Sequence, residues 1–123
     1  MSRTLPKHPS PESFLPVPPA TFHILLALAD GDLHGYAIMQ DVAQRSDGAV
    51  RLGPGTLYGA LKRLLEARLV EESAERADPG RDERRRYYRL TPLGLAVARA
   101  EARRLDAILR AARRKKLIGE RPA

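Results

Sequence analysis

The hydrophobic pattern is clearest in residues 53–69, GPGTLYGALKRLLEARL, around which the rest of the chain can be ordered. Leucines recur there at helical spacing and form one apolar stripe: Leu57, Leu61, Leu64 and Leu65. Pro54 stands at the first helical position, where its missing N–H costs no hydrogen bond. The opposite face is small at its start and then charged: Thr56, Gly59, Lys62, Arg63 and Glu66. The pattern predicts an amphipathic helix whose small, basic face fits a DNA major groove.

Residues 53–69 have two other interpretations. An amphipathic helix is usually only a surface helix of a globular domain. The spacing of Gly53, Gly55 and Gly59 also loosely resembles a dinucleotide-binding loop. That loop needs a buried strand before it and a βαβ unit around it. Only the short run of residues 50–52 precedes the glycines and no parallel sheet is predicted after them, so the nucleotide interpretation is set aside.

Two further helices are predicted before the central one. Residues 19–30 are mostly apolar and end at Gly31, as at a glycine C-cap. The residues expected inside this helix are Phe22, Leu25, Leu26, Leu28 and Ala29. Residues 34–45 carry a second apolar pattern, which ends at the turn Asp47-Gly48. Two helices joined by a brief connection, the second with a basic face, are typical of a helix-turn-helix arrangement.

Beyond Leu69 the spacing changes to that of strands. Residues 69–73 and 84–91 are strand-like, and the turn-forming residues 77–82 lie between them. These segments predict a two-stranded hairpin with a charged tip. Because an isolated hairpin is marginally stable in water, it must pack on the helices. Three helices followed by such a hairpin make a winged helix.

The arginines of the hairpin have two interpretations, and both can hold. Those at the tip can contact phosphates or the minor groove: Arg81, Arg84 and Arg85. Arginines can also pair across the hairpin with the acidic first strand; the candidates are Arg84 and Arg86 opposite Glu71, Glu72 and Glu75. We favour the tip arginines for DNA and those nearer Tyr87 for cross-strand pairing.

The last predicted helix, residues 92–117, is long and begins after a Thr91-Pro92 cap. Its apolar residues alternate spacings of three and four, as in a helix pair: Leu95, Ala98, Ala102, Leu105, Leu109 and Ala112. A domain of this size cannot cover the whole seam, so we expect the far half to pack on a second subunit. The alternative is a helix that folds back on its own domain. The basic run of residues 113–116 suits the negative end of the helix dipole and needs no DNA to explain it.

These elements give a mainly α (α+β) fold: a winged helix-turn-helix with a two-stranded β-wing and a long C-terminal dimerisation helix. The DNA-binding domain is expected at residues 19–91, the dimerisation helix at 92–117 and a disordered tail at 118–123. Residues 1–18 are proline-rich and are expected to form a flexible arm. Phe14, Leu15 and Val17 are the residues that would attach its end to the domain.

Composition limits the partners. A chain of 123 residues fits one domain, and its net charge of +7 favours polyanions, nucleic acid before a membrane surface. There is no cysteine, and no apolar run approaches the ~20 residues that span a bilayer, so a cytoplasmic protein without membrane contact is expected. The scattered histidines form no metal site: His8, His23 and His34. No catalytic motif is present, so we expect neither an enzyme nor a cofactor.

Several ordered motifs resemble PadR-type transcriptional regulators. They are residues 22–28 (FHILLAL), 33–38 (LHGYAI), 52–64 (LGPGTLYGALKRL) and 85–91 (RRYYRLT). The resemblance covers residues 19–109, and the single C-terminal helix is similar to the short subfamily.

The resemblance implies a homodimeric winged-helix repressor that inserts residues 55–63 into the major groove of a pseudo-palindromic operator. Tyr36 and Tyr58 fall on family positions that approach DNA, although Tyr58 is equally suited to packing. With the residues of the central helix, the expected contacts from the helices are Tyr36, Gly55, Thr56, Tyr58, Gly59, Lys62 and Arg63. Two-fold symmetry predicts half-sites about 34 Å apart.

Short PadR-type proteins often sense small molecules between the subunits, in a cavity formed by the first and last helices. The lining here would be Phe22, Ile24, Leu105, Ile108 and Leu109, without the tryptophan on which some members stack planar ligands. The same residues suit a plain dimer interface, which we favour. The alternatives to a sequence-specific regulator are a protein that coats DNA by charge alone and a protein-interaction module.

Overall fold

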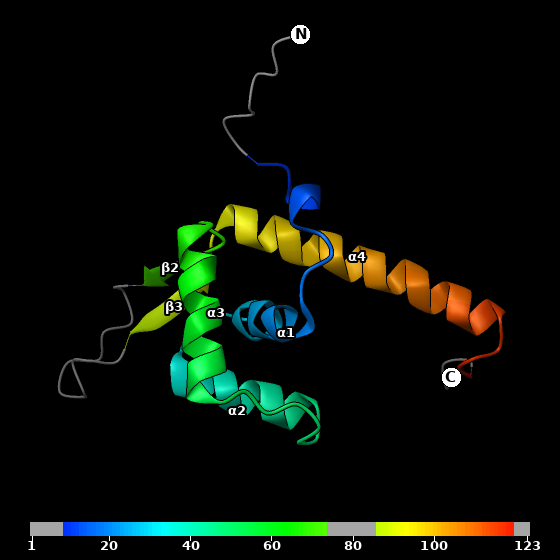
Figure 1. Cartoon of the computed structure of the whole chain (residues 1–123), viewed down its shortest axis with the longest axis horizontal. Helices are drawn as coiled ribbons and strands as arrows, with labels where there is room; N and C mark the ends of the chain where they lie inside the picture. The colour runs from blue at the N-terminus through cyan, green and yellow to red at the C-terminus, as the bar shows by residue number, and fades with distance from the viewer. Residues whose placement is uncertain (1–8, 74–85, 120–123) are drawn as a thin grey trace, which may run out of the picture.

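The computed structural model describes residues 9–73 and 86–119. In chain order the elements are the 3₁₀ helix η1 (Pro11–Phe14), α1 (Pro19–Leu28), β1 (Leu33–His34), α2 (Gly35–Arg45), α3 (Pro54–Glu66), β2 (Val70–Ser73), β3 (Tyr87–Leu90) and α4 (Pro92–Arg114). Figure 1 shows α2 across one end of α3, the β2–β3 hairpin beside α3, and α4 running from the other end of α3 out past the domain. The predicted mainly helical winged helix is confirmed.

The sheet has one strand more than predicted. Its order is β1-β3-β2, and both pairings are antiparallel. The additional strand, β1, places Leu33 opposite Tyr88 and His34 opposite Tyr87. The sequence pattern predicted a turn at Leu33 and a helix start at His34, because a strand of two residues shows no alternation of apolar and polar positions. The strand thereby ties the start of α2 to the hairpin.

The core lies where the four α-helices meet one another and the sheet. Its fully buried side chains include Ile24, Leu25, Ile38, Leu57, Leu61 and Val97. On α1 the predicted inner face is partly wrong, because Leu26 and Ala29 are exposed while Ile24 and Ala27 are buried. The helix is apolar on nearly every side, so its spacing could not define one inner face. Two helices are also shorter than predicted, since α1 ends at Leu28 and α4 at Arg114.

The start of α4 lies against the chain that links α3 to β2. The Thr91 hydroxyl donates to the Arg68 carbonyl at 2.7 Å and accepts from the Gly94 N–H at 3.0 Å, which caps α4 as predicted. A Cβ on Gly94 would overlap the Leu69 carbonyl oxygen. The two backbones are therefore in direct contact, and only glycine fits at this crossing.

The segment before α1 packs along α4. Val17 is buried, and Phe14 and Leu15 pack against the core, as predicted for the end of the arm. Residues 9–18 are thus attached rather than free, while the rest of the predicted arm, residues 1–8, lies outside the described residues.

A buried carboxylate holds this segment in place. Glu101 is 1% exposed and accepts a hydrogen bond of 3.3 Å from the Val17 N–H. Its two oxygens also accept from the Arg104 Nε and Nη2, both at 2.7 Å. These hydrogen bonds, first those from Arg104, lower the pKa of Glu101 and outweigh its burial, which alone would raise it. Glutamate on the apolar seam of α4 had no predicted role.

We expect the Glu101 carboxylate to make the stability of the fold depend on pH, with a loss of stability in acid. Because the pKa of Glu101 is lower in the folded chain than in the unfolded one, its stabilisation is complete above the unfolded-state pKa. The stabilisation is lost as the pH falls through the folded-state pKa. Urea unfolding from neutral to acid pH should therefore show a smaller loss of unfolding free energy for Glu101→Gln than for the wild type.

The control is Glu71→Gln, which removes an exposed carboxylate paired with Arg89 at 2.9 Å. Exposed pairs contribute little, so this variant should follow the wild-type pH profile. Identical profiles for all three proteins would contradict the role of Glu101.

Candidate DNA-binding face

Helix α3 separates a buried stripe from an exposed face. Its buried residues are Leu57, Ala60, Leu61 and Leu64. The predicted contact residues lie on the outside: Gly55, Thr56, Tyr58, Lys62 and Arg63 are exposed, and Gly59 is half-buried. The sequence pattern therefore placed both faces of this helix correctly.

The exposed face is small at its N-terminal end and basic towards its C-terminal end. The N-cap is Gly53, and a Cβ added to Gly53 or Gly55 would meet no atom within 4 Å. One turn further on, a methyl group at Gly59 would lie 3.7 Å from the Arg63 Nη1, so this guanidinium extends back along the helix. The N-terminal half can approach a flat or convex partner closely, and the C-terminal half presents positive charge.

Tyr36 and Tyr58 both lie where α2 and α3 meet. Tyr36 is 59% exposed and Tyr58 is 49% exposed. The Tyr58 hydroxyl nevertheless lies directly against Gly35, the first residue of α2. The Tyr58 ring thus packs on α2, the packing role that the sequence left open, and remains half accessible.

His34 connects this region to the hairpin. Its Nδ1 accepts a hydrogen bond of 3.1 Å from the Ala37 N–H and so caps α2. Its ring is nearly parallel to that of Tyr36, with centroids 6.5 Å apart, and meets the ring of Tyr87 edge-on at 5.4 Å. The sequence pattern placed His34 at the start of this helix and excluded it as a metal ligand, but did not predict that its side chain caps the helix.

The hairpin arginines fall into two groups. Arg86 pairs with Glu72 at 3.2 Å, as predicted, and Arg89 pairs with Glu71 at 2.9 Å, which was not predicted. The predicted tip contacts Arg81, Arg84 and Arg85 lie outside the described residues, as does the acidic candidate Glu75. Tyr88 lies beside Arg89 on β3. Its pKa is raised, first by burial and then by the charge of Glu72 and the proximity of Tyr58.

One exposed cation next to this face was missed. Arg51 lies in the loop between α2 and α3, and its Nη2 comes within 3.2 Å of the place that a Cβ on Gly48 would occupy. Gly48 has φ +80°, a conformation that favours glycine, so the turn and the arginine above it fit together. The sequence pattern assigned no role to Arg51.

The family model for the transcriptional regulator PadR-like family matches residues 24–100. The chain belongs to this family. It is 39% identical over 88 residues to the transcriptional regulator Rv3488 of Mycobacterium tuberculosis, covering 72% of this chain and 77% of that protein. It is 47% identical over 79 residues to an uncharacterised 37.1 kDa protein in transposon TN4556 of Streptomyces fradiae, covering 64% of this chain and only 21% of that longer protein.

Solved structures agree with this assignment. A PadR family transcription regulator from Clostridium difficile superposes with a TM-score of 0.61 and 28% identity, covering 76% of this chain and 94% of that one. The predicted family and winged-helix fold are confirmed, and PadR-like proteins are transcription regulators, not enzymes. Within residues 9–73 and 86–119, no helix is long and apolar enough to span a membrane, and no three potential metal ligands cluster together.

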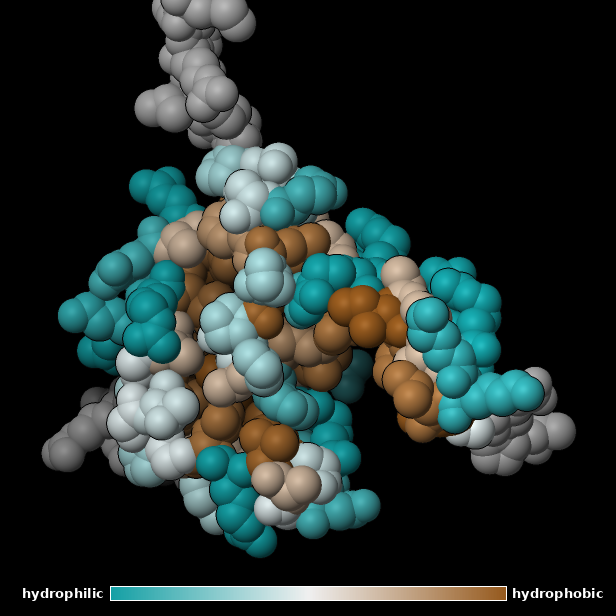
Figure 2. Space-filling view, turned by 45° about the vertical axis from the view of Figure 1, so that its right-hand side comes forward, coloured by the Kyte–Doolittle hydropathy of each residue, from teal (hydrophilic) through white to brown (hydrophobic). Residues whose placement is uncertain are grey.

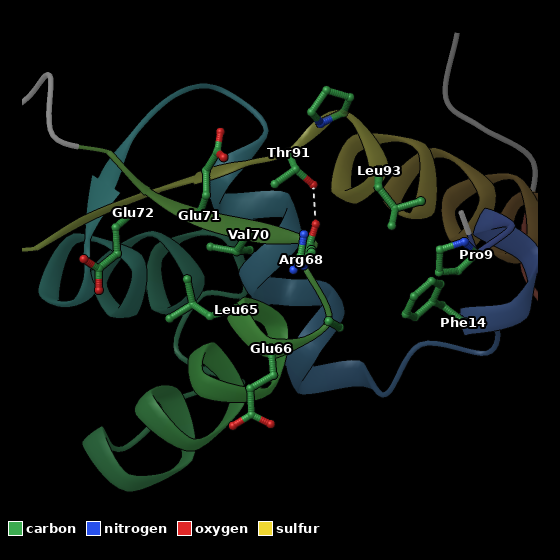
Figure 3. A pocket seen from close by; sticks show the side chains of 12 residues that line it. Pro9, Phe14, Leu65, Glu66, Arg68, Val70, Glu71, Glu72, Thr91 and Leu93 are labelled. Carbon is green, nitrogen blue, oxygen red and sulfur yellow. Dashed lines mark hydrogen bonds between the residues drawn. The ribbon is translucent and has the colours of Figure 1, made fainter. Parts of the chain in front are cut away.

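Two hollows lie away from the exposed face of α3. One, of about 970 Å³, is bounded by the end of α3, β2, the start of α4 and the N-terminal segment (Figure 3). The other, of about 600 Å³, lies between the N-terminal segment, α1 and α4. Phe22 and Leu105, two of the predicted effector-pocket residues, line this second hollow.

The other predicted pocket residues do not line it. Ile24 is wrong as a pocket residue, because it is 0% exposed and belongs to the core of the same protomer. Ile108 and Leu109 lie further along α4 and are about half exposed. The PadR-like chain therefore brings together only part of the predicted lining.

The cap on α2 can be tested by two substitutions at one site. His34→Ala removes the acceptor for the Ala37 N–H and should lower the unfolding free energy by about 1 kcal/mol relative to His34→Asn, whose side chain can also cap a helix. Both variants lose the ring contacts with Tyr36 and Tyr87, so their difference in urea unfolding isolates the cap. Equal stability of the two variants would contradict this role.

Proposed function

We propose that this PadR-like protein is a dimeric, cytoplasmic regulator that binds a pseudo-palindromic operator and represses transcription. The observation that carries the proposal is the exposed face of α3, residues 55–63, on a helix whose other side is fully buried. A rigidly held helix with small residues at one end and positive charge at the other is suited to a DNA major groove.

In the proposed complex the contacts divide by chemistry. Gly55, Thr56 and Gly59 allow the helix to approach the groove, while Lys62 and Arg63 bind phosphates or base edges. Tyr36 and Tyr58 contact the duplex beside them, where both rings are about half exposed. Arg81, Arg84 and Arg85, which lie outside the described residues, are proposed to contact phosphates or the minor groove. The net charge of +7 supports binding to a polyanion.

The proposed dimer forms through the far half of α4. From Ala102 onwards the helix leaves the core, and Ile108 and Leu109 are 52% and 45% exposed. Figure 2 shows apolar surface on this projecting helix and on the body of the domain across from it. The predicted seam begins before this half, at Leu95 and Ala98, and continues along it through Ala102, Leu105, Leu109 and Ala112. Ala98 is already buried within its own protomer, so the remaining residues would carry the interface.

A small-molecule effector is a second proposal that rests on the hollow of about 600 Å³ between α1 and α4. Phe22 and Leu105 line this hollow, and Leu105 is also part of the proposed seam. A ligand held there would favour one angle of α4 over another and so change the distance between the two α3 helices. Repression would then be relieved, because both helices no longer match grooves about 34 Å apart.

The DNA-binding proposal predicts that Lys62→Ala/Arg63→Ala weakens specific binding at least tenfold, because each lost contact costs about 1–3 kcal/mol. The measurement is fluorescence anisotropy with a duplex that the wild-type protein selects from a random pool, with a scrambled duplex as reference. The control, Arg99→Ala/Arg103→Ala, removes the same charge from exposed residues of α4 and should bind almost as the wild type does.

Each alternative function predicts a different outcome. A protein that coats DNA by charge would lose the same affinity in both double variants and would not prefer the selected duplex. An interaction module would select no duplex at all. Either result would overturn the proposal.

The dimer proposal predicts that Leu105→Glu/Leu109→Glu is monomeric in analytical ultracentrifugation, because buried, unpaired carboxylates oppose association. The control is Ala107→Glu, an exposed position on α4 outside the predicted seam, which should remain dimeric. A monomeric wild type, or a double variant of unchanged mass, would show that α4 does not form the interface.

A further inference from the structure

The backbone conformation of Gly35 does not explain why a glycine stands at this position. It is the first residue of α2, it is buried, and it lies directly before the exposed Tyr36. The glycines with positive φ are Gly31 and Gly48 within the described residues, so Gly35 has a backbone that any residue can adopt. Space rather than conformation must require glycine here.

The required space is taken by Tyr58. A Cβ on Gly35 would overlap the Tyr58 hydroxyl oxygen and would lie 2.9 Å from Cζ and 3.2 Å from Cε1. All three atoms belong to the outer end of the phenol ring. The Tyr58 ring on α3 therefore lies directly on the backbone at the start of α2, with no side chain between them.

The same corner is fixed from its other sides. His34, directly before Gly35, caps α2 and pairs with Tyr87 in the sheet. Its ring lies parallel to that of Tyr36. The start of α2 is thus held by the cap and the strand, so Tyr58 is the group that would move if a side chain were added.

We infer that Gly35 is a positioning residue for DNA recognition, which acts by letting the Tyr58 ring lie against α2. This inference rests on the proposed function of the α3 face. With a methyl group at residue 35, the half-exposed ring would swing outward, because its outer end is the mobile part of the side chain. It would then stand between the helix and the duplex, beside Tyr36. The three nearest atoms to this methyl group all belong to the outer end of the Tyr58 ring, so we expect this ring to move rather than the core.

The test compares Gly35→Ala with the wild type on the selected duplex at one fixed salt concentration. We expect Gly35→Ala to bind about tenfold more weakly, equivalent to about 1.4 kcal/mol, while its melting temperature changes little because the displaced ring is already half exposed. Gly119→Ala is the control, because a methyl group there meets nothing within 4 Å, and it should match the wild type in both measurements.

A double-mutant cycle identifies Tyr58 as the group through which Gly35 acts. In the Tyr58→Ala background Gly35→Ala should cause no further loss, because the overlapping ring is gone. Tyr58→Phe, which lacks only the hydroxyl, should reduce the effect and keeps the cycle measurable if Tyr58→Ala binds too weakly.

The outcomes separate this inference from the proposed function. If the wild type prefers its selected duplex and Gly35→Ala binds equally well, the inference is wrong and the proposed function stands. Equal losses in all backgrounds would show that Gly35 does not act through Tyr58. A large fall in melting temperature for Gly35→Ala would make it a folding residue instead. Absence of sequence preference in the wild type would overturn both.

Discussion

The contact between Gly94 and the Leu69 carbonyl fixes how the two halves of the molecule are joined. It presses the first turn of α4 onto the chain between α3 and β2, at a distance that excludes even a methyl group. Thr91 adds hydrogen bonds to both sides of the same crossing. Because backbone meets backbone, little freedom remains for α4 to tilt independently of α3. The direction of the projecting half of α4 is therefore tied to the exposed face of α3.

The N-terminal segment strengthens this arrangement from the outside. Glu101 accepts hydrogen bonds from the Val17 N–H and, within α4, from Arg104, so α4 is held to residues 9–18 by a buried hydrogen bond as well as by apolar packing. The hollow between these elements and α1 lies directly beside the carboxylate. In a dimer built on α4, a change at this hollow would reach α3 through the Gly94 crossing. Under the proposed function, this crossing would couple the proposed effector site to the proposed DNA-binding face.

Much of the candidate DNA-binding face could be predicted because α3 is strongly amphipathic. Leucines at helical spacing fixed its buried side, so the exposure of Lys62, Arg63 and Thr56 followed. The same reasoning failed on α1, whose apolar residues surround the whole helix and left Ile24 misplaced in a ligand pocket. It also missed β1, which is too short to alternate. The ring contact between His34 and Tyr87 was missed as well, because the two residues are 53 positions apart in the chain.

Local sequence patterns were sufficient to predict the elements whose apolar residues repeat with a single period: α2, α3, α4 and the strands of the hairpin. Proline and threonine at the helix starts set where α3 and α4 begin, because capping is local chemistry. The packing of distant elements, in contrast, explains why Gly35 and Gly94 must be glycine and why Glu101 is buried. Each answer depends on an atom from another element, Tyr58, Leu69 or Val17, and no local pattern records which distant groups will meet.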